Sequence, residues 1–303
     1  MANKVIEVRQ ITKHYGPIQA VDGVDMAVEA GEVFGLIGHN GAGKSTLFKM
    51  MLGLVPASSG EIRIDGSPVR GEEFRRVRRH LGYLPENVVF YDNLSGLETL
   101  AFFASLKGVD HGECAPLLAR VGLSAAASRR VKGYSKGMRQ RLGFAQALLG
   151  QPKLLFLDEP TNGLDPEGIR DFYLILKEMK SEGATIILTS HILSEIQERV
   201  DRLAIMKTGK IQAIGTVQSL REQMALPLRF ELRLADGAEA ELQRVVAMLD
   251  GAKVSVDGER ATVHCQRESK MPVLQALAAL GGRVTDLHIR EPSLEDVFLG
   301  YSG

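Results

Sequence analysis

The chain has little cysteine, no excess charge of either sign and no long apolar run. Its 303 residues contain only two cysteines, Cys114 and Cys265, which lie far apart. This excludes a disulfide-rich scaffold and fits a reducing compartment. Lys plus Arg and Asp plus Glu both number 37, so the composition gives no sign of a nucleic-acid surface.

Membrane and secretion signals are also missing. No apolar run approaches the roughly twenty residues that span a bilayer, and the start MANKVIEVRQ lacks the apolar core of a signal peptide. We therefore expect a soluble chain in the cytoplasm. Its length is sufficient for one or two sizeable cores, so a second, smaller domain is expected.

The first strong motif is GHNGAGKST, residues 38–46, between the apolar run EVFGLI and the stretch LFKMMLGL. The spacing of Gly38, Gly43, Lys44 and Ser45 is that of a phosphate-binding P-loop, in which backbone N–H groups surround an anion at a helix N-terminus. Lys44 is expected to reach the β and γ phosphates, and the Ser45 hydroxyl to ligate Mg²⁺. A plain tight turn is the alternative, which the Lys-Ser pair at a strand-to-helix junction disfavours.

The segments around this motif predict an α/β architecture. Two alternating stretches ahead of it, VIEVRQI and VDGVDMAV, predict strands, and GEIRIDG predicts another behind it. Between Ser95 and Gly150 the apolar period becomes helical. The sequence therefore predicts a helical segment, at about residues 90–150, inserted before the next strands.

Two buried strands carry polar residues at their carboxyl ends. KLLFLDEP, residues 153–160, contains Asp158 and Glu159, and TIILTS, residues 185–190, is followed by His191. Ligands bind at the carboxyl ends of strands in open α/β sheets. Asp158 is thus a candidate for holding Mg²⁺ and Glu159 for polarising an attacking water. The alternatives are a helix cap or solvated turn for the acidic pair, and a structural role for the histidine.

The stretch YSKGMRQR, residues 134–141, alone predicts only an N-cap before a basic helix. Together with the other motifs it resembles the signature motif of ABC ATPases, and the resemblance covers about the first 215 residues. It implies a P-loop NTPase fold of the ABC nucleotide-binding type, with a RecA-like core, an antiparallel β subdomain and a helical subdomain. It also implies an active ATPase that uses ATP and Mg²⁺.

The resemblance implies roles for individual residues. Glu159 would be the catalytic base, His191 the switch histidine, and Lys44 a further catalytic residue, while Ser45 and Asp158 would bind Mg²⁺. Tyr15 would stack on adenine. Ser135 and Gly137 would reach the γ phosphate of the opposite subunit, and Asp165 would lie at the dimer contact. The loop residues that would bind the nucleotide are Gly38, His39, Asn40, Gly41, Ala42, Gly43, Lys44, Ser45 and Thr46.

Three positions depart from the usual family pattern. Glu86 stands in YLPEN where glutamine is usual, in the loop that couples to the partner; its carboxylate can still ligate Mg²⁺ but adds negative charge near phosphate. Lys136 replaces the first glycine of the signature pair, and Tyr134 stands where leucine is common. None of these changes removes a group that hydrolysis needs.

Two copies of the chain are expected to act together. One P-loop face leaves the γ phosphate open on its other side, and phosphoryl transfer needs charge compensation there. A second copy would supply Ser135 and the N-terminal end of the following helix. The resemblance further implies an integral membrane permease as partner, with the chain peripheral on the inner face of the cell membrane.

The tail from about Leu226 onward has its own pattern of elements. Stretches from LRFELRL to VTDLHIRE give the order β-α-β-β-α-β. We therefore expect an ATPase domain over residues 1–222 and a ferredoxin-like α+β accessory domain over 223–303. The ending EPSLEDVFL resembles the C-terminal extension of some export-type ABC ATPases, where dimer contact and regulation are both open roles.

A closer resemblance concerns the stretches GYLPENVVFYDNLSGLETL and YSKGMRQRLGFAQALLGQPKLLFLDEPTNGLDP. They are similar to the ATPase subunit of Nos-type copper-processing ABC systems, which serve the maturation of nitrous oxide reductase, and this implies a periplasmic copper-processing partner. No chemistry in the chain itself indicates copper. His111 and Cys114 in HGEC have metal-ligand spacing, but two ligands are too few and a loop-to-helix junction is the alternative.

Other functions remain open at this stage. A soluble ABC ATPase acting on DNA or ribosomes would require a long coiled-coil insertion, a second cassette or a basic stripe, which the sequence lacks. A regulatory protein that binds nucleotide without hydrolysis is disfavoured by Glu159 and His191. Export of another substrate by the same ATPase type stays an alternative, because the permease would contact the substrate.

Overall fold

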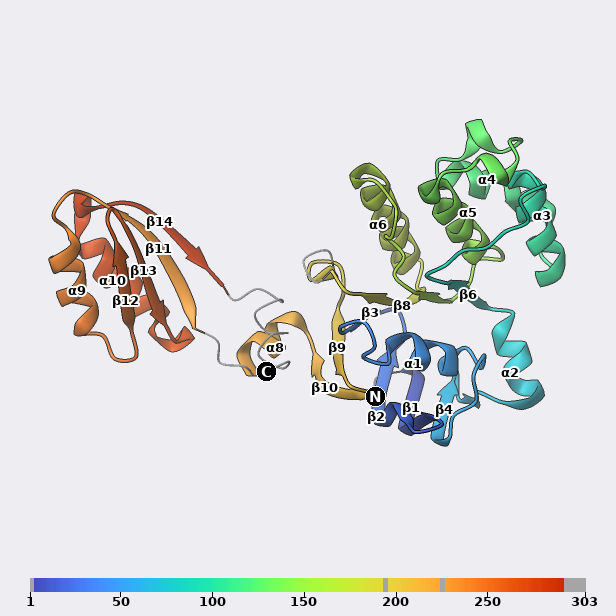
Figure 1. The fold of residues 1–303 in the computed structure, drawn as a ribbon, viewed down its shortest axis with the longest axis horizontal. Helices are drawn as coiled ribbons and strands as arrows, with labels where there is room; N and C mark the ends of the chain where they lie inside the picture. Colours follow the sequence, from blue (N-terminus) through green and yellow to red (C-terminus); the bar gives the residue numbers. More distant parts are fainter. Residues whose placement is uncertain (1–2, 193–195, 224–226, 292–303) are drawn as a thin grey trace. The chain divides into compact units, whose positions relative to one another are not determined.

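The computed structural model describes residues 3–192, 196–223 and 227–291 (Figure 1). The chain forms two compact units, residues 1–216 and 217–303. The sequence-based boundary lies between Glu222 and Gln223, whereas the structure assigns the whole helix α8 (Val217–Gln223) to the second unit. The division therefore falls before this helix and not near its end.

A six-stranded sheet forms the centre of the first unit, in the order β10-β9-β3-β8-β7-β6. All neighbours are parallel except β9 and β10. Every residue of β3, β7 and β8 is buried, as uninterrupted apolar runs predict for strands covered on both faces. The strands are β3 (Val33–Ile37), β6 (Leu81–Leu84), β7 (Leu154–Leu157), β8 (Thr185–Ser190), β9 (Arg202–Lys207) and β10 (Lys210–Gly215).

A second, antiparallel sheet has the order β2-β1-β4-β5. Helix α1 (Lys44–Met51) lies in the core that both sheets share, where the Phe48 ring meets the Phe156 ring of β7 edge-on, with centroids 5.5 Å apart. The helix behind the P-loop is thereby anchored to both sheets. The strands are β1 (Lys4–Tyr15), β2 (Ile18–Glu29), β4 (Ser59–Ile64) and β5 (Ser67–Pro68).

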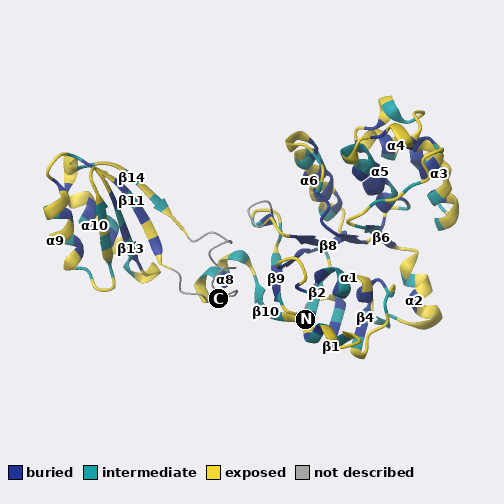
Figure 2. Ribbon diagram, in the orientation of Figure 1, coloured by how far each residue is buried: buried dark blue, intermediate teal, exposed yellow. Residues whose placement is uncertain are grey.

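Three further helices of the first unit, α3, α5 and α6, begin with side-chain caps in the described part of the chain. Ser95 and Glu98 form a capping box at the start of α3, and Asp165 accepts a hydrogen bond from the Gly168 N–H at the start of α6. These contacts satisfy backbone groups that a helix start leaves open. The inward faces of these helices are buried (Figure 2). The α-helices described in this unit after α1 are α2 (Gly71–Arg78), α3 (Gly96–Lys107), α4 (Cys114–Arg120), α5 (Lys136–Leu148) and α6 (Pro166–Ser181).

The second unit has the order βαββαβ that the tail predicts, and its antiparallel sheet has the strand order β12-β13-β11-β14. Leu242 and Leu277, one from each helix, pack around Phe230 in a single apolar core. The rest of EPSLEDVFL after Glu291 lies outside the described residues. The elements are β11 (Leu228–Leu234), α9 (Glu239–Ala247), β12 (Lys253–Asp257), β13 (Arg260–Cys265), α10 (Lys270–Ala279) and β14 (Val284–Arg290).

Within the described ranges, no helix combines the length and the apolar character needed to cross a bilayer. Cys114 and Cys265 are both buried, and both are free thiols. Cys114 lies in the first unit and Cys265 in the second.

Candidate functional site

The P-loop motif joins the end of β3 to the start of α1. Gly43 has a φ of 103°, in the left-handed region that favours glycine, and a Cβ on Gly38 would lie 2.3 Å from the carbonyl oxygen of Met206. The first N–H groups of α1 have no acceptor inside the helix, and the helix dipole adds positive charge at this end. The loop therefore has the geometry of an anion site.

A cleft of about 620 Å³ lies over this loop. Tyr15, at the end of β1, contributes a ring that is 46% exposed, and the Lys13 ammonium lies 5.0 Å from the ring centre. An exposed aromatic ring beside a phosphate site offers a stacking surface for a base. The residues lining the cleft are Tyr15, Ile18, Gln19, Ala20, Asn40, Gly41, Ala42, Gly43, Lys44, Ser45, Thr46, Glu86, Glu159, His191, Thr208 and Gly209.

Lys44 is the buried cation of the cleft, with a side chain that is 6% exposed. Its Nζ donates to the carbonyl oxygens of Gly38, at 2.7 Å, and His39, at 3.2 Å. It also lies 3.9 Å from Glu159 Oε1. Burial lowers the pKa of Lys44, and nearby carboxylates, that of Glu159 above all, partly offset this shift.

One hydroxyl group contacts both acidic residues that follow β7. Thr189, on β8, donates to Asp158 Oδ1 at 2.7 Å and accepts from the Glu159 backbone N–H at 2.8 Å. On the other side, His191 Nδ1 lies 2.7 Å from Glu159 Oε2. Sequence analysis missed Thr189, because a threonine inside a buried strand gives no sign of its cross-strand partners.

Glu159 has an unusual backbone, with a φ of 48°. The left-handed region costs a residue with a Cβ roughly 1–2 kcal/mol, and such conformations concentrate at functional sites. The hydrogen bond from its N–H to Thr189 holds this conformation. The carboxylate is thereby directed toward His191 and Lys44 in the cleft.

The donor set fits a magnesium ion bound together with phosphate. Asp158 is 3% exposed, and no ion pair reaches its carboxylate in the described part of the chain, so a divalent cation would compensate a buried charge. Ser45 and Glu86 add oxygen donors from the cleft. No cluster of three or more His, Cys, Asp or Glu side chains forms a metal site among the described residues, which agrees with the way Mg²⁺ takes ligands from phosphates.

Ser135, Gly137 and Asp165 do not line the cleft. Ser135 is exposed and caps α5 by accepting from the Met138 N–H at 3.2 Å. Asp165 caps α6, and Arg141 Nη2 lies 3.4 Å from its Oδ1, a contact that sequence analysis missed. Within one chain, the P-loop set and the signature set therefore lie at different places on the first unit.

Two departures from the family pattern have local structural explanations. Tyr134 is buried, and its hydroxyl donates to the carbonyl oxygen of Ala126 at 2.7 Å, an anchor that leucine would lack. The stem of Lys136 packs against Gly163, where a Cβ would lie 2.9 Å from the Lys136 Cδ. The lysine is therefore accommodated by a glycine in the segment before α6.

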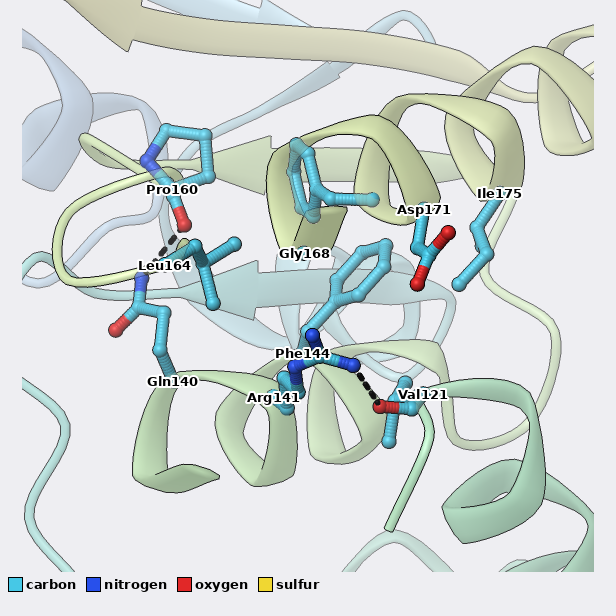
Figure 3. Close-up of a pocket in the computed structure, with 10 residues that line it drawn as sticks. Val121, Gln140, Arg141, Phe144, Pro160, Leu164, Gly168, Asp171 and Ile175 are labelled. Carbon is cyan, nitrogen blue, oxygen red and sulfur yellow. Dashed lines mark hydrogen bonds between the residues drawn. The ribbon is translucent and has the colours of Figure 1, made fainter. Parts of the chain in front are cut away.

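A narrow crevice of about 20 Å³ lies between α5, α6 and the segment after β7 (Figure 3). Gln140 Nε2 donates there to the carbonyl oxygen of Pro160 at 2.9 Å, and the rings of Phe144 and Phe172 lie 4.5 Å apart. This volume holds little more than one water molecule, so it excludes a nucleotide. The crevice is a small gap in the packing between α5, the helix that begins in the signature motif, and the segment that ends at Asp165.

His111 and Cys114 do not form a metal site. His111 Nε2 lies 2.8 Å from the Ser105 hydroxyl, and Cys114 is buried at the start of α4, where burial raises the pKa of its thiol. The two residues occupy a junction between a short 3-10 helix and α4. This is the loop-to-helix alternative that the sequence left open.

Both units match models of known protein families. A family model described as ABC transporter matches residues 21–162, and a model for the C-terminal domain of DrrA1-3-like ATP-binding proteins matches residues 215–302. The second match includes all six elements of the βαββαβ unit, for which the sequence predicted a fold but no relative by name.

Relatives match the chain along nearly its whole length. The daunorubicin resistance ATP-binding protein DrrA3 of Streptomyces coeruleorubidus is 33% identical over 100% of this chain and 97% of the relative. The linearmycin resistance ATP-binding protein LnrL of Bacillus subtilis is 32% identical over 99% of this chain and 98% of the relative. A solved structure, an ATP-binding subunit of an ABC transporter, is 34% identical with a TM-score of 0.67 and covers 72% of this chain and 92% of its own.

Proposed function

The chain belongs to the ATP-binding subunits of ABC transporters, which hydrolyse ATP, and we propose that it drives a permease that exports an antibiotic-like small molecule. The observation that carries the hydrolytic part is the contact of 2.7 Å between His191 and Glu159 in the cleft over the P-loop. The export part rests on the relatives named for resistance to daunorubicin and linearmycin.

In this proposal each polar group in or beside the cleft has one task in hydrolysis. Glu159 accepts the proton of the attacking water, and His191 orients its carboxylate. Lys44 exchanges its contacts with the loop carbonyls for phosphate oxygens and compensates their charge. Ser45, Asp158 and Glu86 would hold Mg²⁺, which supplies further charge compensation at the phosphates.

Two copies of the chain complete the site. Ser135 and Asp165 lie away from the P-loop cleft of their own chain, and the γ phosphate needs positive charge on its open side. The N-terminus of α5, a helix of 13 residues, supplies a positive dipole end beside the exposed Ser135. The proposal is that each subunit presents this end to the nucleotide of the other.

An apolar surface on the helical subdomain is the proposed permease contact. Tyr91 is 62% exposed and its ring lies 5.9 Å from that of Phe102 on α3. Val89 and Leu106 are also exposed large apolar residues. Exposed apolar groups that gather in this way mark interaction sites, and this surface follows the Glu86 segment of the cleft directly in sequence.

Copper processing remains the finer hypothesis from the sequence. It rests on the resemblance of two stretches, and no relative reported above carries a copper-related name. The described residues hold no cluster of three metal-ligating side chains. Export of an antibiotic-like compound is therefore the function that we propose, and the copper pathway is an outcome that the experiment below distinguishes.

The experiment is co-purification of the tagged Glu159→Gln chain from its native membranes with ATP and Mg²⁺. We expect a polytopic permease to be recovered with it, and cells that lack the chain to become more sensitive to antibiotics. Recovery of a periplasmic copper-site maturation protein would favour the copper pathway. A homodimer without any membrane partner would contradict the transporter proposal.

A surface variant tests the permease contact separately. Tyr91→Glu should lose the permease while keeping ATP binding, because the residue lies outside the cleft. Leu174→Glu, at another exposed apolar residue, on α6, is the matched control and should keep both. Equal loss of the permease in the two variants would remove Tyr91 from the proposed contact.

A further inference from the structure

Within residues 227–291, one face of the second unit's sheet is open. Helices α9 and α10 lie along the other face of this sheet (Figure 1). Alternate residues of the strands pack into the core with these helices, and the intervening side chains point away from that core. Strand pairing aligns these outward side chains in rows across the sheet. One row, here called the basic row, consists of Lys253, His264, Arg229 and Arg290, in the order β12, β13, β11, β14.

The basic row places two arginines, Arg229 and Arg290, directly opposite one another. Lys253 pairs with His264, His264 with Arg229, and Arg229 with Arg290. Directly opposed side chains lie about 5 Å apart at Cβ, and like charges at that distance destabilise a sheet. This cost is offset when an anion lies over the row.

Little within the chain neutralises this row. Arg290 Nη1 lies 3.4 Å from Glu231 Oε1, whereas in the described part of the chain no ion pair involves Arg229 or Lys253. Both are exposed. Since the whole chain carries no formal net charge, the row is a local concentration of positive charge.

The other rows of the same face are mixed. Ser255, Thr262, Glu231 and His288 form the middle row, while Asp257, Arg260, Arg233 and Asp286 form the last one. In the last row Arg260 and Arg233 also oppose one another, but Asp257 lies opposite Arg260 and Asp286 opposite Arg233, so the row as a whole has no net charge. The positive charge is thus confined to the end of the sheet where β11 begins and β14 ends.

The shape of the basic row indicates which class of anionic partner it fits. A peptide that joins a sheet adds to an edge strand, but the basic row crosses all four strands of an open face. No Phe, Tyr or Trp stands in the three rows, so the face lacks the stacking groups with which similar sheets bind single-stranded RNA. A flat array of anions, such as the headgroups of a bilayer, matches a flat row of cations.

We propose that the open sheet face of the second unit docks on anionic phospholipid headgroups through the basic row. Lys253, Arg229 and Arg290 lie over the headgroup phosphates, and His264 fills the row between Lys253 and Arg229. The contact is separate from the permease surface at Tyr91 and from ATP binding. It holds the chain at the membrane also when the permease is absent.

Vesicle binding by the purified full-length chain tests the proposal. The probes are vesicles of phosphatidylcholine alone and of phosphatidylcholine with about one third phosphatidylglycerol, with flotation as readout. We expect binding only to the anionic vesicles, and its loss when salt is raised from about 0.1 M to about 0.5 M. Arg229→Glu should weaken this binding by at least about tenfold.

Arg244→Glu is the matched control, because Arg244 is exposed on α9 and the variant changes the net charge equally. It should bind the anionic vesicles as the unaltered chain does. Thermal unfolding checks both variants, and Lys253→Glu on the edge strand β12 replaces Arg229→Glu if that variant does not fold. Equal weakening by Arg229→Glu and Arg244→Glu, equal binding to both vesicle types, or tighter binding to an oligo-glutamate peptide than to anionic vesicles would each overturn the proposal.

Discussion

In the first unit eleven polar or charged residues are buried, whereas among the described residues of the second unit none is. Two of the eleven, Lys44 and Glu159, line the nucleotide cleft, and two more, Asp158 and Thr189, lie beside Glu159 and are joined by a hydrogen bond. Burying charge is costly unless partners are present. In the first unit, therefore, part of the free-energy cost of burying charge falls at the nucleotide cleft.

The second unit has its charges on its surface. Its core is apolar, and its charged residues stand on the open sheet face and the outer helix faces. Surface charge at ordinary exposure cannot provide perturbed acids and bases, but it can recognise a charged partner. The buried charges that catalysis needs are therefore found in the first unit, while the described charges of the second unit lie on its surface.

The largest effect is expected from Lys44→Ala, which should abolish nucleotide binding because the P-loop loses its buried cation. Lys107→Ala is the matched control: Lys107 Nζ also donates to two carbonyl oxygens, those of Leu81 and Leu149, and burial also lowers its pKa. The control should lose stability but keep ATP affinity in a fluorescence titration. Unchanged ATP affinity in Lys44→Ala would count against the P-loop interpretation.

Thr189→Val should lower kcat by about tenfold or more, since Glu159 and Asp158 lose their shared hydroxyl. Thr185→Val, at the other end of β8, removes a buried hydroxyl that accepts from the Gly31 N–H at 2.9 Å. Both variants should lose about 1–3 kcal/mol of unfolding free energy. Steady-state ATPase assays separate them, and equal kcat values would show that Thr189 acts on stability alone.

A smaller effect is expected on the open sheet face. Arg229→Thr should raise the stability of the second unit by up to about 1 kcal/mol, because it removes one of the two directly opposed arginines of the basic row. Ser255→Thr on the same face of the sheet is the control for strand propensity. The readout is the thermal transition of the second unit, and a decrease in Arg229→Thr but not in Ser255→Thr would contradict the repulsion.

The smallest effect concerns Tyr83 on β6. Burial, with a contribution from the negative charge of Asp158, raises the pKa of Tyr83 to about 12 from an ordinary 10.0. The folded state therefore keeps this proton longer, and the stability that it contributes is present below pH 10 and lost as the pH rises toward about 12. The measurement is the ultraviolet titration of the unaltered chain minus that of Tyr83→Phe, which should reveal one phenol with this raised pKa. A difference curve with the ordinary tyrosine pKa would contradict the partial burial of Tyr83.

Local patterns predicted the parts of the molecule in which neighbours in sequence act together. The P-loop, the buried strands β7 and β8 and the order βαββαβ follow from glycine spacing and apolar periodicity. Helices α2 and α6 and strands β9 and β10 were not predicted, and the unit boundary lies before α8.

The parts that could not be predicted depend on contacts between distant segments. The hydrogen bonds of Thr189 cross from β8 to the end of β7, and the contact of Arg141 with Asp165 joins α5 to the start of α6. The basic row exists only because strand register aligns four residues that are scattered along the tail. Register depends on the packing of the whole sheet and leaves no local sign in the sequence.

The most direct test of the nucleotide site compares two buried glutamates of the first unit. Glu159 lies in the cleft beside His191, while Glu32 pairs with Arg202 at 3.2 Å and does not line the cleft. Measured side by side, Glu159→Gln should bind ATP with unchanged affinity and lose turnover by about 10² to 10⁴-fold, while Glu32→Gln should hydrolyse ATP at the normal rate. A Glu159→Gln chain that turns over ATP at the normal rate would contradict the assignment of this cleft as the hydrolytic site.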